Sequence, residues 1–268
     1  MGKYLHVFGI GIQNTLVYRI NFLVKSSFGL IPLTGTLFLW RAIYQGDGHP
    51  GGIDGYTLSG MISYYLLVTL VDALTAVAED DWQIAADIKD GNISQFLLKP
   101  INYFCYRLCL YLSGRAIYTT VALIPVTLFI AYLHQHFQGP VSIGGLVAAL
   151  TAAVMGGVLQ FLIAFTMALL AFWVLDVSTF IFLQFALEYL ASGHLFPLDI
   201  LPKGLVTVIN CTPYPYLLYF PVGIYLGRVE GSEIWRGFAV QTAWILAMFF
   251  ISQWVWRRGL KRYTAAGG

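Results

Sequence analysis

The run from residue 116 to residue 175, AIYTTVALIPVTLFIAYLHQHFQGPVSIGGLVAALTAAVMGGVLQFLIAFTMALLAFWVL, decides the fold because it contains no Asp, Glu, Lys or Arg. A helix needs about 20 mostly apolar residues to cross a bilayer, so this run is too long for one crossing. The turn signal HQHFQGP at 134–140 divides it. The run therefore predicts two membrane spans, at about Cys109–Leu133 and Ile143–Val174.

Composition places the whole chain in a membrane. Its 268 residues are 58% apolar and 10% charged, whereas soluble domains carry about 25% charged residues. A net charge of +2 gives no broad basic field, so we expect no nucleic-acid partner. The three cysteines have no metal or redox spacing, and His134 and His136 alone make a poor metal site, so no metal is expected.

Four further spans are predicted outward from the central pair, at Ser26–Tyr44, Tyr56–Ala78, Val177–Ala191 and Gly237–Trp256. The uncharged segment Gly204–Gly227 is long enough to span, but its three prolines favour broken, re-entrant or interfacial helices. With six spans, ten basic residues fall on the inner side and four on the outer side. The expected fold is an all-α, single-domain membrane protein (1–268) with six transmembrane helices and both termini cytoplasmic.

The N-terminal residues 1–20 are too polar to span. Apolar residues recur there at three- and four-residue steps, at Tyr4, Leu5, Phe8, Ile12 and Leu16. This spacing is typical of an amphipathic helix that lies in the membrane interface. An ordinary lead-in to the first span is the alternative.

The charged insert AEDDWQIAADIKDGNISQFLLKPIN (78–102) follows the second span and holds five of the thirteen acidic residues. We expect two helices parallel to the membrane, broken at Gly91-Asn92, with Asn92 as N-cap and Gln95 completing a capping box. Its apolar positions are expected to be buried: Trp82, Ile84, Ile88, Ile93, Phe96, Leu97 and Leu98. Such an insert is typical of a docking surface for a soluble partner.

Three charged residues, Asp72, Arg115 and Glu188, fall within or at the ends of spans. Charge in hydrocarbon is costly, and such residues usually face a partner or a wet cavity. One hypothesis is a polar cargo path or a gating ion pair, with Asp72 and Arg115 paired to each other. Structural pairs between helices, or snorkelling at the interface, are the alternative. The small-residue rows in the fourth span, which include Gly156 and Gly157, predict close helix packing.

Four motifs recur in an order that resembles a known family. They are YR (18–19), IKDGNISQFLLKPIN (88–102), SGHLFPLDILP (192–202) and PYLLYFPVGIYLG (215–227), placed between six spans. Together they resemble the permease subunit of the type-2 class of ABC transporters, the exporter-like integral membrane family. The resemblance covers essentially the whole chain.

The resemblance implies specific roles. Residues 1–20 would be a connecting helix, and 79–99 a cytoplasmic coupling segment. The residues of that segment that engage an ATPase subunit would be Asp87, Ile88, Lys89, Asp90, Gly91 and Asn92. The re-entrant segment 192–227 would form an outer gate with Phe196, Pro197, Pro213, Pro215 and Pro221. Two permeases, the same or homologous, would form a dimer through their first and fifth spans, together with two ATPases and membrane lipids.

The residues themselves support a division of labour, because no G-x-x-x-x-G-K-[ST] sequence exists in the chain. We therefore expect no enzymatic activity here, with ATP and Mg²⁺ bound by a partner subunit. The expected function is export of an amphipathic or lipid-like substrate by alternating access, at the bacterial inner membrane. The alternatives are a secondary transporter or channel, which usually shows inverted repeats, and an intramembrane lipid-modifying enzyme.

Overall fold

The computed structural model describes residues 2–45, 53–76 and 80–263, in which helices dominate. The long helices are α2 (Arg19–Gln45), α3 (Leu58–Thr75), α6 (Tyr103–Tyr132), α7 (Ile143–Ala168) and α11 (Ser232–Arg262). The shorter α-helices are α1 (Gly2–Val17), α4 (Asp80–Lys89), α5 (Ile93–Leu97), α8 (Ser178–Ala191), α9 (Lys203–Asn210) and α10 (Tyr219–Tyr225). Four 3₁₀ turns connect them: η1 (His134–His136), η2 (Leu169–Phe172), η3 (Leu198–Ile200) and η4 (Tyr214–Tyr216).

Within the described residues, five helices are long and apolar enough to cross a bilayer: α2, α3, α6, α7 continued by η2, and α11. The predicted fifth span is present as α8, but it has only 14 residues. At 1.5 Å per residue it rises about 21 Å, less than the roughly 30 Å of a bilayer core. The all-helical prediction is confirmed, whereas the six-span layout is not established by helix length.

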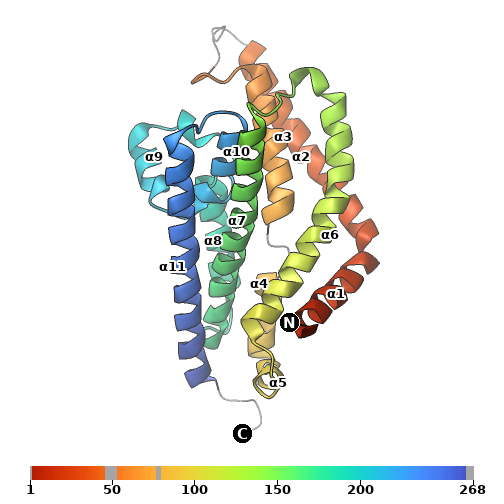
Figure 1. The fold of residues 1–268 in the computed structure, drawn as a ribbon, viewed down its shortest axis with the longest axis vertical. Coiled ribbons are helices and arrows are strands. Elements are labelled where there is room, and N and C mark those ends of the chain that lie inside the picture. Colours follow the sequence, from red (N-terminus) through yellow and green to blue (C-terminus); the bar gives the residue numbers. More distant parts are fainter. Residues whose placement is uncertain (1, 46–52, 77–79, 264–268) are drawn as a thin grey trace.

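The chain from α8 to α11 is broken in the way that its prolines predict. After α8 it continues through η3, α9, η4 and α10, none longer than eight residues. Pro202 directly precedes α9, and Pro221 lies in the first turn of α10, where a missing N–H costs little. Figure 1 shows these short helices near the end of the bundle opposite α5 and the last turns of α11. The short α8 and this broken segment together return the chain to the start of α11.

Helix α7 packs closely on its neighbours through small residues. A Cβ added at Gly156 would lie 2.9 Å from the backbone oxygen of Leu217, and one at Gly157 would lie 3.4 Å from the Tyr111 hydroxyl. The buried Gln241 of α11 donates to the carbonyl oxygens of Ala152 (2.8 Å) and Tyr216 (2.9 Å). The rows of small residues therefore serve helix packing, as predicted.

We expect Gly156→Ala to lower the free energy of unfolding by about 1–3 kcal/mol, because the new methyl group meets rigid backbone. Gly35→Ala in α2 is the matched control, since a Cβ there has no atom within 4 Å. Thermal unfolding of both variants in detergent measures the difference. Equal unfolding temperatures would contradict this packing.

Candidate functional site

The charged insert forms α4 and α5, whose apolar side chains anchor it to the bundle. Ile84, Ile88 and Ile93 are buried in a cluster that draws on five other elements. The cluster partners include Tyr103 of α6, Phe165 of α7, Leu169 of η2, Ile181 of α8 and Val255 of α11. Helices α4 and α5 therefore pack against α6, α7, α8 and α11 through one apolar cluster.

Parts of the sequence prediction for this segment are wrong. The sequence predicts that Trp82 and Leu98 are buried, but they are 47% and 89% exposed. Asn92 has helical backbone and makes no side-chain cap; the Ser94 hydroxyl instead donates to the Gly91 carbonyl. The break itself is where predicted, since Gly91 has φ +77°, a conformation that favours glycine. The side chain of Leu97 lies outside the described residues.

A buried ion pair joins α4 to α6. Arg107, which is 5% exposed, forms a salt bridge with Asp87. The Tyr103 hydroxyl donates to Asp87 at 2.7 Å and accepts from Arg107 Nε at 3.0 Å. Arg107 also donates to the side chain and the carbonyl oxygen of Gln83, each at 3.2 Å. We call this set of four residues the α4–α6 clamp.

The six residues predicted to engage an ATPase, 87–92, lie on two faces of this segment. Asp87 and Ile88 face the bundle, and a Cβ on Gly91 would lie 3.6 Å from the hydroxyl of Tyr263. Lys89 and Asp90 are exposed, and Asn92 is partly exposed. Of the six, Lys89 and Asp90 are therefore the most exposed. Sequence reasoning missed Arg107 because nothing in the spacing links it to Asp87.

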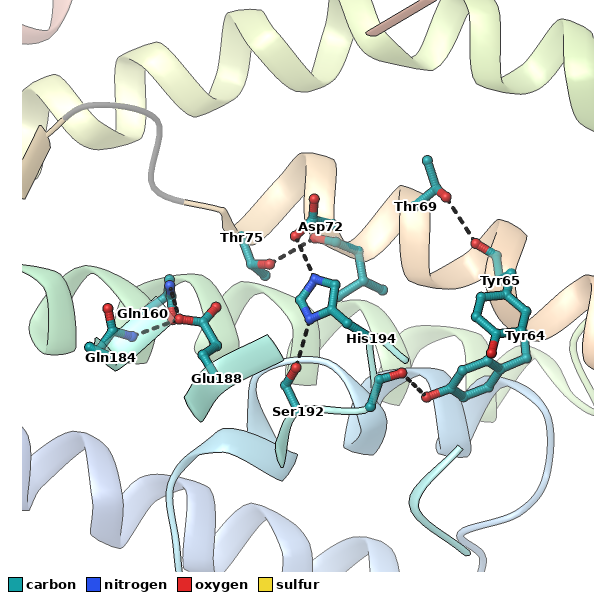
Figure 2. A network of polar contacts seen from close by, with 12 residues as sticks. Tyr64, Tyr65, Thr69, Asp72, Thr75, Gln160, Gln184, Glu188, Ser192 and His194 are labelled. Carbon is teal, nitrogen blue, oxygen red and sulfur yellow. Dashed lines mark hydrogen bonds and ion pairs between the residues drawn. The ribbon is translucent and has the colours of Figure 1, made fainter. Parts of the chain in front are cut away.

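A second polar network lies where α3 meets the chain after α8 (Figure 2), with the Asp72 side chain 47% exposed. The His194 ring contacts Asp72 through Nε2 at 3.1 Å and Ser192 through Nδ1 at 2.7 Å. The predicted Asp72–Arg115 pair is not formed in this structure, and the carboxylate contacts His194. Arg115 lies against the ring of Tyr118, 4.8 Å from its centroid.

Glu188 forms the other half of the network with two glutamines. Its Oε2 accepts from Gln160 of α7 at 2.8 Å and from Gln184 of α8 at 2.7 Å. All three side chains are buried, and Figure 2 shows both amides turned toward the carboxylate. Two amide donors compensate part of the cost of burying this group. Glu188 therefore holds α7 and α8 together.

A cavity of about 280 Å³ lies beside Asp72 and His194. Residues of α2, α3 and α6 line it together with Tyr189, His194 and Leu195. Its wall is mixed: Thr36, Thr69, Lys25 and Asp72 supply polar groups, while Leu33, Val68 and Val126 are apolar. The cavity suits a group that carries both polar and apolar parts.

The predicted outer-gate residues lie in the broken segment. Pro197, Pro215 and Pro221 are buried, and Phe196 and Pro213 are partly buried. The segment is tied to α3, because the Tyr64 hydroxyl donates to Gly193 (2.6 Å) and the Tyr65 hydroxyl donates to Leu195 (2.5 Å). The residues that surround His194 are thus held at two further points.

Comparison with known proteins gives one match. The family model described as ABC-2 family transporter protein matches residues 30–267. No curated protein matches the chain, and no solved structure does. The match covers every predicted site residue discussed above.

Proposed function

This chain belongs to the ABC-2 family of transporter proteins, and on that premise we propose that it is the membrane subunit of an ATP-driven exporter. The family and the apolar helices make it a multi-pass membrane permease of the kind that associates with ABC ATPase subunits. The proposal adds the direction of transport, an amphipathic or lipid-like cargo, and ATP and Mg²⁺ bound on the partner. It places the chain in a bacterial inner membrane with both termini cytoplasmic.

The α4–α6 clamp is the observation that carries the proposal. Force applied to α4 by a soluble partner needs a stiff connection to the membrane helices. The salt bridge, the Tyr103 hydroxyl and the buried isoleucines supply one, since they hold α4 on α6 and on the cluster formed by α7, α8 and α11. The exposed Lys89 and Asp90 then remain free to contact an ATPase.

The contacts of α4 support alternating access, in which the cavity opens to one side of the membrane at a time. Movement of α4 would shift α6 and α8, whose residues adjoin the network at Asp72, Glu188 and His194 and the 280 Å³ cavity. That cavity would take cargo from the inner side, and the broken segment from η3 to α10 would close the outer side. The sixth crossing would be composite, made of α8 and this segment. A second permease would pack against α2 and α8, which expose large apolar side chains such as Phe28 and Phe182.

We expect the double variant Lys89→Glu/Asp90→Lys to retain the co-expressed ATPase at least about tenfold more weakly, because it reverses both charges on the outer face of α4. Lys203→Glu on the exposed surface of α9 is the control for a charge change elsewhere. The measurement is the amount of ATPase that co-purifies with the tagged permease. Unchanged retention would reject α4 as the docking element, and transport by the chain alone would reject the ATP-driven mechanism.

A further inference from the structure

A second, larger cavity lies between α1, α2 and α6, beside α4, and shares Lys25 and Tyr118 with the first. It encloses about 710 Å³. The charged residues that line it are Lys25 and Arg115, and no acidic residue of the described part of the chain lines it. Its other polar lining is uncharged and is supplied by Asn14, Thr15, Tyr18, Asn21, Gln83 and Tyr118.

Arg115 is a buried cation that forms no ion pair with any residue the structure describes. Its side chain belongs to a residue that is 8% exposed, and within the described residues no carboxylate lies within ion-pair distance of it. Arg107, two turns earlier on the same helix, is equally buried but is neutralised by Asp87. Burying a guanidinium costs free energy unless an anion or a hydrogen-bond acceptor compensates the lost hydration. The tyrosine ring at 4.8 Å compensates only part of this cost.

Lys25 and Arg115 lie on adjacent helices, each at the boundary between a charged and an uncharged stretch of sequence. Lys25 directly precedes the apolar stretch that begins at Ser26, and Arg115 directly precedes the uncharged run 116–175. Arg115 forms the floor of the cavity, whereas Lys25, Asn14 and Asn21 are exposed at its rim. Lipid phosphates lie at this boundary, and basic pockets between helices there bind anionic head groups.

We propose that this cavity binds the phosphate group of an anionic membrane phospholipid. The Arg115 guanidinium contacts the phosphate oxygens, Lys25 adds a second charge, and the amides of Asn14 and Asn21 donate hydrogen bonds. Gln83 lines the same cavity and also accepts from Arg107, so the bound lipid adjoins the α4–α6 clamp. The proposal stands independently of the cargo and the direction of transport.

The test is lipid binding by the purified, delipidated full-length chain in detergent, followed by native mass spectrometry. Phosphatidylglycerol should bind at least about tenfold more tightly than phosphatidylcholine. Arg115→Gln should lose about that factor, and Lys25→Gln should lose part of it. Arg41→Gln is the matched control, because it removes an exposed cation from the other end of α2. Equal affinities in Arg115→Gln and Arg41→Gln would overturn the proposal.

The unfolding temperature is a second measurement, and the direction of its change tests whether Arg115 binds the lipid. Without lipid, Arg115→Gln should unfold at the same temperature as the unaltered chain or higher, because it removes an uncompensated buried charge. Phosphatidylglycerol should raise the unfolding temperature of the unaltered chain and of Arg115→Lys, but not that of Arg115→Gln. If millimolar inorganic phosphate reproduces the rise or displaces the lipid, the site binds a soluble anion and the lipid assignment is wrong.

Discussion

Replacing Asp87 and Arg107 together by leucine and methionine should reduce transport by about 100-fold while leaving the protein folded. Two apolar residues of similar volume often substitute for a buried ion pair with little loss of stability, and sometimes with a gain. The hydrogen bonds from Arg107 to Gln83 and from Tyr103 to Asp87 would nevertheless be lost, so only apolar packing would connect α4 to α6. The measurements are transport into vesicles, ATPase activity and thermal unfolding.

Single substitutions at the clamp should behave differently. Asp87→Ala leaves the buried Arg107 without its partner, which costs about 3–5 kcal/mol of folding free energy. The charge swap Asp87→Arg/Arg107→Asp should recover part of the transport that either single reversal loses. Transport at the original rate in the Asp87→Leu/Arg107→Met variant would show that α4 moves α6 without the clamp. ATPase that remains bound but no longer responds to cargo would support the clamp as the connection.

The sequence predicts the helical membrane architecture well because the bilayer imposes strong constraints. A charge-free run as long as 116–175 fits two membrane spans and few other structures. Helices α6 and α7 overlap the two predicted spans. The prolines between Pro202 and Pro221 likewise exclude a continuous helix there. The predicted bounds of the fifth span, Val177–Ala191, match α8 to within one residue, and the backbone turns just beyond it at Gly193, which has φ +98°.

The site was less predictable because its pairs connect distant positions. Asp87 and Arg107 are twenty residues apart on different helices, and Asp72 and His194 are 122 residues apart. Hydropathy identifies Asp72, Arg115 and Glu188 as costly residues but does not say which partner reaches each one. Opposite charge favoured Asp72 with Arg115, whereas the turn after α8 brings His194 to the carboxylate instead. Gln160 and Gln184 carried no signal, since isolated glutamines in apolar helices have many roles.

A double-mutant cycle separates the two possible partners of Asp72. We expect Asp72→Asn and His194→Gln to be coupled by about 0.5–1 kcal/mol, because their side chains meet at 3.1 Å and the carboxylate is partly exposed to solvent. Asp72→Asn and Arg115→Gln should be nearly additive, within about 0.5 kcal/mol, because no ion pair joins them. Unfolding free energies in detergent for the unaltered chain, the two single variants and the double variant of each cycle supply both values.

The same variants connect this network to transport. The Asp72 carboxylate and the His194 ring line the 280 Å³ cavity and also link α3 to the chain after α8. Because that link must open or shift when the cavity changes access, Asp72→Asn should slow transport by about tenfold or more even where the protein remains folded. Thr36→Val, on the α2 wall of the same cavity, controls for loss of a polar lining group without loss of the link. If Thr36→Val slows transport as much as Asp72→Asn does, the polar cavity wall matters and the Asp72–His194 link does not. If the double-mutant cycle couples Asp72 to Arg115 and not to His194, the active transporter uses a different pairing from the one described.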